Sequence, residues 1–296
     1  MGARDGAPEL LQAPAADLAS REYPFERADF ERVRRLIFAY AGISLNDGKH
    51  NMVYGRLARR LRATGMRSFR EYLDRLENDR AFAAVERQQF VNALTTNLTA
   101  FFREAHHFPI LAEYLRAHAA RGDLRLWCAA ASTGEEPYSL AMTAIETLGP
   151  GTGVRILATD IDTQVLAHGE RGIYRVDALG PCGAERVRRF FLRGTGANEG
   201  LARVRPELAR LVSFAPLNLL ADDWSALAAF APMVDVVFCR NVMIYFDKPT
   251  QRRVVDRIAR VVRPGGLLFV GHSENLADQR AQFAARGHTV YERIGA

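Results

Sequence analysis

Residues 95–104, with the sequence TTNLTAFFRE, combine polar side chains, two adjacent phenylalanines and one arginine in a single short segment. A purely structural linker needs neither three threonines and an asparagine in five positions nor an arginine directly after two aromatic residues. The segment predicts a turn folded over a small polar ligand, with the phenylalanines excluding water. Asn97, Thr99 and Arg103 would supply the hydrogen bonds to that ligand.

A second polar segment follows the first expected strand and leads directly into a helix at Pro137. Its sequence, AAASTGEE over residues 129–136, lacks the G-x-G-x-x-G pattern that lets backbone amides approach a pyrophosphate. The two carboxylates at the helix start would also repel a phosphate, which favours the positive end of a helix dipole. S-adenosylmethionine fits this loop better, because it carries no phosphate and its cationic groups can face acidic residues.

Polar side chains also follow the later strands. Asp160 ends the second strand, where its carboxylate can accept hydrogen bonds from both ribose hydroxyls; a role as helix N-cap stays open for it and for Asp162. Asn218 and the pair Arg240 and Asn241 follow two further strands, and an asparagine can match the donor and acceptor edge of adenine. Ligands of open α/β sheets bind beyond the carboxyl ends of the strands, so these groups predict one shared site.

The elements that must position these groups alternate between strand and helix from residue 124 onward. Apolar runs predict strands at LRLWCAA, VRILATDID, DVVFCRN and LLFVGHS, and helices are expected at residues 137–147 and 249–262. The second helix is expected to stop at RPGG, residues 263–266, and residues 288–294 to add a last strand. This succession predicts a doubly wound parallel sheet.

Between residues 182 and 214 the alternation of strand and helix patterns gives way to short apolar segments. They flank a glycine-rich tip that contains Gly194, Gly196 and Gly200. We expect a small antiparallel β insertion in the α/β domain. It is either a plain surface excursion or a docking site, because an extended peptide can add a strand to an open sheet edge.

Residues 21–92 predict an N-terminal all-α domain of three or four helices, after a tail at residues 1–20 that we expect to be disordered. Helix ends are marked by glycines at 42 and 65 and by an N-cap serine at 68. The second helix gathers its basic residues on one face: Lys49, Arg56, Arg59, Arg60 and Arg62. No acidic residue interrupts that face, so it is either solvated surface or a docking face for an acidic helix or polyanion.

Composition narrows the functional classes. The chain has 296 residues, which favours two domains or one domain with an appended module. With 48% hydrophobic residues and apolar runs too short for a membrane span, it is expected to be soluble. The formal charge of +6 suggests an acidic partner. Three cysteines at spacings that match no zinc pattern indicate a reducing cytoplasm and no metal site. The adjacent His106 and His107 do not share a helix face and are interpreted as helix-entry residues.

Taken in order, TTNLTAFFRE, CAAASTGEEPYSLA, ATDID, FAPLNLL, FCRNVMIYF and RPGGLLFVGHSEN resemble the chemotaxis receptor methyltransferases (CheR). That family methylates receptor glutamates with S-adenosylmethionine, releasing S-adenosylhomocysteine. The resemblance implies a Rossmann-like methyltransferase domain over residues 93–296, with these cofactor contacts: Asn97, Thr99, Arg103, Glu135, Asp160, Asn218, Leu219, Arg240 and Asn241. Glu136 stays open as the alternative to Glu135. Arg103 and Tyr245 would lie near the transferred methyl group.

The resemblance also implies two receptor contacts. Family members present an arginine-rich helix to the receptor's methylation region, a pattern matched by Lys49, Arg56, Arg59 and Arg62. Enteric members hold a pentapeptide at the receptor C-terminus with a β subdomain, a pattern resembled by Arg193, Gly194, Gly196 and Arg203. The expected partners are therefore cytoplasmic domains of methyl-accepting receptors. The enzyme is expected to be a cytoplasmic monomer that neither binds nucleic acid nor inserts into the membrane.

A glutamate carboxylate is already ionised at neutral pH, so its methylation requires no general base. The site must instead align the carboxylate oxygen with the methyl carbon and exclude water. Tyr245 is the expected orienter, because a tight pair with Arg103 would stabilise the ground-state carboxylate. Three other functions are alternatives: a nucleic-acid methyltransferase, whose Asn/Asp-Pro-Pro-aromatic segment is missing, a nicotinamide-dependent oxidoreductase, and a non-catalytic receptor or cofactor adaptor.

Overall fold

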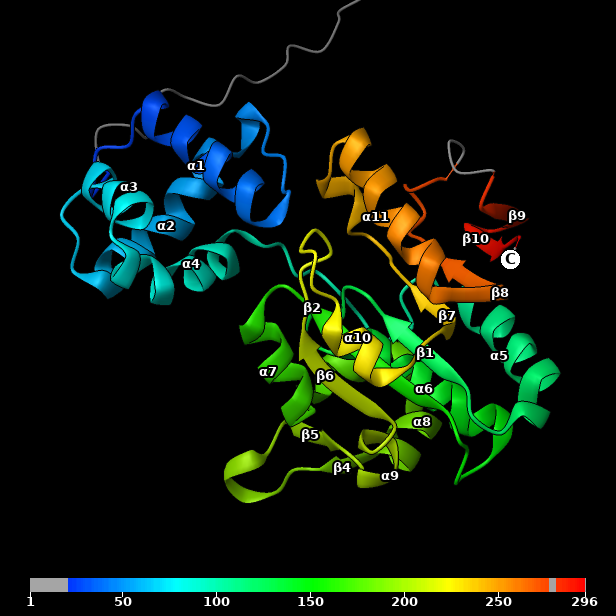
Figure 1. Ribbon diagram of the computed structural model, residues 1–296. Helices are drawn as coiled ribbons and strands as arrows, with labels where there is room; N and C mark the ends of the chain where they lie inside the picture. Colours follow the sequence, from blue (N-terminus) through cyan, green and yellow to red (C-terminus); the bar gives the residue numbers. More distant parts are fainter. Residues whose placement is uncertain (1–20, 277–280, 296) are drawn as a thin grey trace, which may run out of the picture.

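The computed structural model describes residues 21–276 and 281–295, so the tail expected at residues 1–20 lies outside it. The described chain forms a helical unit beside a larger α/β unit (Figure 1). Within these ranges no helix combines the length and apolarity that crossing a membrane would require.

Four helices make up the N-terminal unit: α1 (Arg27–Ala41), α2 (His50–Thr64), α3 (Phe69–Asn78) and α4 (Arg80–Leu94). The expected helix ends are confirmed. Gly42 and Gly65 end α1 and α2 with φ of 68° and 69°, a left-handed conformation that glycine adopts without strain. Ser68 caps α3 by accepting a hydrogen bond from the backbone N–H of Glu71. The buried faces of the four helices pack into one apolar core.

The basic face of α2 does have acidic partners, which corrects the expectation of an unneutralised stripe. Arg60 forms two hydrogen bonds of 2.8 and 2.7 Å with buried Glu86 of α4. The Tyr72 hydroxyl donates to the same carboxylate at 2.9 Å. Arg62 lies 3.6 Å from Glu22. These carboxylates come from other elements of the unit, so the pattern along α2 alone did not reveal them.

The main sheet has the strand order β6-β2-β1-β7-β8-β10-β9. Its strands are β1 (Arg125–Cys128), β2 (Arg155–Asp160), β6 (Val212–Pro216), β7 (Val234–Phe238), β8 (Val262–Phe269), β9 (Phe283–Gly287) and β10 (Val290–Arg293). The pairs from β6 to β8 are parallel, which confirms the predicted sheet. β10 and β9 add an antiparallel edge, of which the sequence predicted only β10.

Helices cover both faces of this sheet, as a doubly wound fold requires. Leu126 and Cys128 of β1 face a core shared with α5 (His107–His118) and α6 (Glu135–Leu148). Trp127, between them, faces the opposite core, which includes α10 (Ser225–Phe230) and α11 (Lys248–Val261). The remaining α-helices of the unit are α7 (Thr163–Arg171), α8 (Gly183–Phe190) and α9 (Pro206–Ala209).

The RPGG segment was expected to separate α11 from the following strand, but it lies within that strand. β8 begins at Val262, directly after α11, and contains all four residues. Its pairing with β7 shifts register between Val234 and Val236. A proline is tolerated in a strand at such an irregularity, because it has no N–H to donate.

A second sheet of three antiparallel strands confirms the β insertion and enlarges it. The order is β3-β5-β4, with β3 (Ile173–Arg175), β4 (Phe191–Arg193) and β5 (Leu201–Val204). The expected hairpin is β4 and β5, whereas β3 precedes residue 182. The run after residue 211 does not join this sheet, since it forms β6 at the edge of the main sheet.

Candidate functional site

A cavity of about 200 Å³ lies between the helical unit and the carboxyl ends of the parallel strands. The helical unit contributes Ile43, Leu45, Lys49 and Met52 to its lining. The α/β unit contributes the loops that follow β1, β2, β6 and β7. The cavity brings together every predicted cofactor and catalytic residue except Glu135: Asn97, Thr99, Arg103, Asp160, Asn218, Leu219, Arg240, Asn241 and Tyr245.

Segment 95–104 is fixed at both ends. At its start, the Thr95 hydroxyl lies 2.7 Å from the Asp162 carboxylate, to which Asn97 Nδ2 also donates at 2.8 Å. Near its end, the Phe102 backbone N–H donates to the Ser139 hydroxyl at 3.0 Å. The two phenylalanines do not line the cavity, contrary to expectation; they are buried in the core of the α/β unit. They therefore anchor the segment, and water exclusion over the ligand falls to other residues.

The Arg103 side chain is engaged within the same segment. Its Nη1 donates to the Leu98 carbonyl at 2.8 Å, and the guanidinium is half-buried in the lining of the cavity. Leu98 itself is 80% exposed. The segment thus presents Arg103 to the cavity in an orientation that an internal bond already sets.

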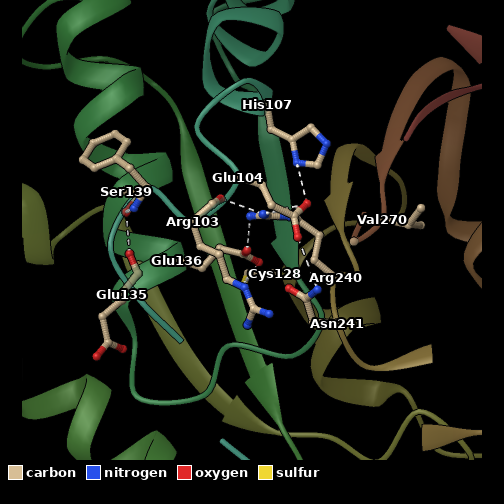
Figure 2. Close-up of polar contacts among 12 residues, drawn as sticks. Arg103, Glu104, His107, Cys128, Glu135, Glu136, Ser139, Arg240, Asn241 and Val270 are labelled. Carbon is tan, nitrogen blue, oxygen red and sulfur yellow. Dashed lines mark hydrogen bonds and ion pairs between the residues drawn. The ribbon is translucent and has the colours of Figure 1, made fainter. Parts of the chain in front are cut away.

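The two glutamates at the start of α6 have different surroundings. Glu136 is buried, lines the cavity, and accepts hydrogen bonds from Arg240 Nη1 at 2.6 Å and from Cys128 Sγ at 3.2 Å. Glu135 accepts a bond from the Thr133 hydroxyl at 2.6 Å and does not line the cavity. Figure 2 shows the Glu135 carboxylate pointing away from Arg240. The geometry therefore favours Glu136 as the carboxylate beside a bound ligand.

The open question about the two aspartates after β2 is answered by their hydrogen bonds. Asp162 is the N-cap of α7, accepting from the backbone N–H groups of Gln164 and Val165. Asp160 caps no helix: its oxygens accept from the backbone N–H groups of Ser132 at 2.8 Å and Asp162 at 3.0 Å. Burial raises the pKa of Asp160 from 3.8 to about 6. Asp160 is thus a buried carboxylate at the cavity that remains able to accept ribose hydroxyls.

Asn218 connects the two units. Its Nδ2 donates to the Tyr40 carbonyl of the helical unit at 2.8 Å, and its Oδ1 accepts from the Leu220 backbone N–H at 2.9 Å. Both polar atoms of the amide are therefore occupied within the protein, which argues against the expected free adenine-binding edge. Leu219, the next residue, is buried and offers an apolar contact.

Arg240, which lines the cavity, is the centre of an ion cluster (Figure 2). Besides Glu136, its guanidinium contacts the Arg103 carbonyl at 2.6 Å and the Glu104 carboxylate at 3.2 Å through Nη2. Burial acts to raise the pKa of Glu104, but His272, Arg240 and Asn241 outweigh it and lower that pKa to about 2. The cluster thus holds two carboxylates around one cation.

Two carboxylates that hold the cavity residue Asn241 were not predicted from the sequence. Glu104 accepts from Asn241 Nδ2 at 3.3 Å, and Glu274 accepts from the Asn241 backbone N–H at 2.9 Å. Together they fix Asn241, whose φ of 57° lies in the left-handed region. Both glutamates do stand inside polar motifs, at the end of TTNLTAFFRE and within GHSEN, which is the signal that could have found them.

Left-handed backbone conformations gather at this site. Of the non-glycine residues with positive φ, Ser132 and Asn241 line the cavity, and Phe102 and Glu104 flank Arg103. Such conformations persist only where the surrounding contacts impose them, and they concentrate at functional sites.

Tyr245 ends a short 3₁₀ turn, Met243–Tyr245, that follows β7. Its side chain is half-buried and lines the cavity. Its backbone carbonyl accepts from the Ser44 N–H of the helical unit at 2.8 Å. The predicted orienter therefore lies where the two units meet.

The predicted receptor contacts lie on two surfaces. On α2 and just before it, Lys49, Arg59 and Arg62 are exposed and Arg56 is half-buried. Arg193 and Arg203 are exposed on β4 and β5, and neither lines the cavity.

The predicted glycines of the β insertion have structural reasons of their own. A Cβ on Gly194 would lie 2.1 Å from the Asn198 carbonyl oxygen, and Gly196 has a φ of 58°. Both are therefore required by the shape of the tip, whatever it binds.

The histidines start α5, as interpreted from the sequence. Burial, followed by the effect of Arg240, lowers the pKa of His107 to about 4, so it is neutral at neutral pH. Glu104, His106 and His107 have ligand atoms within 4.8 Å of one another. However, Glu104 is bound by Arg240 and His272, and His107 Nε2 lies 2.8 Å from the His288 carbonyl, so these groups are engaged by the protein.

Comparison with known proteins matches both units. The family described as CheR methyltransferase, all-alpha domain, matches residues 28–95, and CheR methyltransferase, SAM binding domain, matches residues 97–291. A chemotaxis protein methyltransferase of Klebsiella aerogenes is 53% identical, covering 93% of this chain and 92% of the relative. That of Escherichia coli is 52% identical over 89% of this chain and 90% of its own. Chemotaxis protein methyltransferase 2 of Pseudomonas aeruginosa is 49% identical over 94% and 97%.

Proposed function

The chain belongs to the CheR family of chemotaxis methyltransferases, and on that premise we propose that it methylates glutamate side chains in the cytoplasmic domains of chemotaxis receptors. S-adenosylmethionine is the cofactor and S-adenosylhomocysteine the product. The observation that carries the proposal is the cavity between the two family-matched units, where the predicted residues meet at the carboxyl ends of the strands. A nucleic-acid methyltransferase is not favoured by the comparisons.

The residues of the cavity fit this cofactor. Apolar side chains such as Met52, Leu217 and Val242 suit the adenine ring and the aliphatic chain, and Asp160 can accept from the ribose hydroxyls. Glu136 and Asp160 present two carboxylates to the cavity, and Glu136 is held there by Arg240. Either carboxylate can face a cationic group of the cofactor. The bound cofactor would supply an electrophilic methyl group.

We propose that Arg103 and Tyr245 orient the substrate carboxylate. Arg103 already uses one of its five N–H groups on the Leu98 carbonyl, so fewer remain for an incoming carboxylate. A weaker hold on the ground-state carboxylate is favourable, because tight ground-state binding would slow the transfer. Tyr245 offers a neutral hydroxyl at the cavity and remains the better direct orienter. No proton needs to be removed, because the carboxylate is ionised at neutral pH.

We propose that Lys49, Arg59 and Arg62 dock the receptor's helical methylation region. All three are exposed on the helical unit, and Lys49 also lines the cavity, which connects the docking surface with the site. The cationic surface complements the acidic glutamates of such a region.

A second contact is proposed at the β insertion, where Arg193, Gly194, Gly196 and Arg203 would bind the receptor's C-terminal pentapeptide. Two exposed arginines on neighbouring strands support this assignment, because they can pair with carboxylates of a peptide. Methylation rates of receptors with and without their last residues would test it: loss of those residues should slow methylation only if the insertion tethers the peptide.

We further propose that the enzyme acts as a monomer in the cytoplasm. One chain supplies every side of the cavity in the described ranges, so a second copy is not needed to complete it. The three cysteines are buried and unpaired, as suits a reducing compartment.

The reaction is tested by incubating the protein with methyl-labelled S-adenosylmethionine and either a receptor cytoplasmic fragment or RNA. Label on the receptor that is released by mild base would identify a glutamyl methyl ester. Replacing the receptor's methylatable glutamates by alanine is the matched control and should remove the label. Label on RNA alone would overturn the proposal.

A further inference from the structure

Arg56 differs from its basic neighbours on α2. Lys49, Arg59 and Arg62 are exposed, whereas Arg56 is half-buried. Its Nη1 donates to the backbone carbonyl of Thr95 at 2.5 Å. This bond and the half-buried position hold the side chain against the start of segment 95–104, so Arg56 is less accessible to a receptor carboxylate than Arg59 and Arg62.

The acceptor, Thr95, is where α4 ends and segment 95–104 begins. Its backbone is extended, with φ of −65° and ψ of 152°, and its side chain is buried beside Asp162. Carbonyls at the end of a helix have no partner within the helix, so a side chain must satisfy them when they are shielded from water. The Arg56 bond fixes the peptide that leads to Asn97 and Thr99, both of which line the cavity.

The same guanidinium lies within electrostatic reach of Tyr245. Burial lowers the pKa of Arg56, and the Tyr245 phenol acts in the opposite direction. The helical unit contacts Tyr245 a second time, through the Ser44 N–H. Arg56 therefore holds the start of segment 95–104, and Ser44 of the same unit holds the strand-end turn that carries the proposed orienter.

We propose that Arg56 is a positioning residue of the methyl-transfer site, which holds the start of segment 95–104 over the cofactor cavity, and that it does not belong to the receptor-docking surface. This inference rests on the proposed function and removes Arg56 from the docking residues that the family resemblance implied. It gives Arg56 and Arg59, three residues apart on α2, different roles.

The experiment measures two affinities in the full chain. Calorimetric titration with S-adenosylhomocysteine, without receptor, reports the cofactor site. Arg56→Ala should weaken this affinity about tenfold, because a shielded carbonyl loses its donor and Asn97 and Thr99 lose their fixed position. Arg56→Lys should recover most of it, since an ammonium can still donate to Thr95. Arg116→Ala, an exposed charge loss on α5, is the control for net charge and should leave the affinity unchanged.

Steady-state methylation of a receptor fragment gives the second readout. Arg59→Ala should raise the receptor KM, whereas Arg56→Ala should lower kcat and leave the receptor KM near that of the parent. The inference is wrong if Arg56→Ala keeps its S-adenosylhomocysteine affinity and raises the receptor KM as Arg59→Ala does.

The two proposals can fail separately. The titration contains no receptor, so it decides the role of Arg56 even if the receptor fragment is never methylated, which would overturn the proposed function instead. If Arg56→Ala fails to fold, the Arg56→Lys and Arg56→Gln variants carry the comparison. The glutamine side chain is shorter than lysine and reaches less far toward the Thr95 carbonyl. The Arg56→Gln protein should therefore bind S-adenosylhomocysteine more weakly than the Arg56→Lys protein.

Discussion

Arg240 and the arginines of α2 carry the same guanidinium group in opposite surroundings. Arg240 is buried and contacts two carboxylates and a carbonyl. Arg59 is exposed, and Arg62 has a neighbouring carboxylate only at 3.6 Å. A buried cation is fixed by its ion pairs and in turn fixes the side chains that contact it. An exposed cation stays hydrated and samples several rotamers until it binds a partner. The fixed arginine suits a cofactor-binding site, and the exposed arginines suit a docking surface.

Removal of Arg240 should have the largest effect. Arg240→Ala leaves buried Glu136 without its counter-charge, and losing one partner of a buried ion pair costs about 3–5 kcal/mol. The free energy of unfolding, measured with denaturant, should fall by that order and cofactor binding should be lost. Glu136→Gln, which keeps the shape, should lose less. If the Arg240→Ala protein were as stable as the parent, the site would tolerate an unpaired Glu136 carboxylate. The contrast between buried Arg240 and the exposed arginines of α2 would then be wrong.

The pH dependence of Asp160 should have the next largest effect. Its folded-state pKa is raised to about 6, above its ordinary 3.8, so the protonated form is favoured by folding. Its contribution to stability is therefore present below pH 3.8, is lost as the pH rises to about 6, and is constant above, by about 2–3 kcal/mol in total. Asp160→Asn should lack this slope when unfolding free energies are compared between pH 4 and 7.

Cofactor binding gives the opposite sign at the same residue. Ribose hydroxyls donate to the ionised carboxylate, so S-adenosylhomocysteine affinity should fall as the pH drops below about 6. Asp160→Asn should bind weakly at every pH, with a flatter profile. Parallel profiles for the parent and the variant would contradict a role for Asp160 in binding.

Tyr245 lies between the two regions and should show an intermediate effect. Tyr245→Phe removes only the hydroxyl that orients the substrate carboxylate, so kcat should fall about tenfold, or about 1.4 kcal/mol of transition-state stabilisation. Cofactor affinity should stay the same, because the ring remains in the cavity lining. Single-turnover methylation of a receptor fragment measures the chemical step. An unchanged rate would remove Tyr245 from the mechanism.

The smallest effect is expected on the exposed helix. Arg59→Ala should raise the receptor KM about twofold to fivefold at low salt, as is usual for one exposed charge. The difference from the parent should shrink as the ionic strength rises, because salt screens exposed charges. A salt-independent effect would mean that Arg59 is buried in the complex, and the contrast with Arg240 would then apply only to the free enzyme.

The features that could be predicted from the sequence are those set by residues close together along the chain. Gly42 and Gly65 ended their helices, and Ser68 started one, because caps are local structures. The polar strand ends met at one cavity because parallel strands bring their carboxyl ends to the same edge of a sheet.

What could not be predicted depends on long-range geometry. Glu135 and Glu136 differ by about 100° around their helix, so which one faces the cavity depends on how α6 rotates against the sheet. The Asn218 amide is occupied by Tyr40, a residue of the other unit, which no pattern near Asn218 indicates. Glu104 and Glu274 acquire their roles from one shared partner, Asn241, which meets them only in the folded chain.

The two hydrogen bonds that join the units, from Asn218 to Tyr40 and from Ser44 to Tyr245, have a consequence for protein engineering. A chimaera that takes its helical unit from one relative and its α/β unit from another would exchange one wall of the cofactor cavity along with the receptor specificity. Its turnover number would then change even if the new receptor docked perfectly. Changes of receptor specificity should therefore be made only at exposed side chains of α2. Residues 40–45 should be kept from the same protein as the α/β unit.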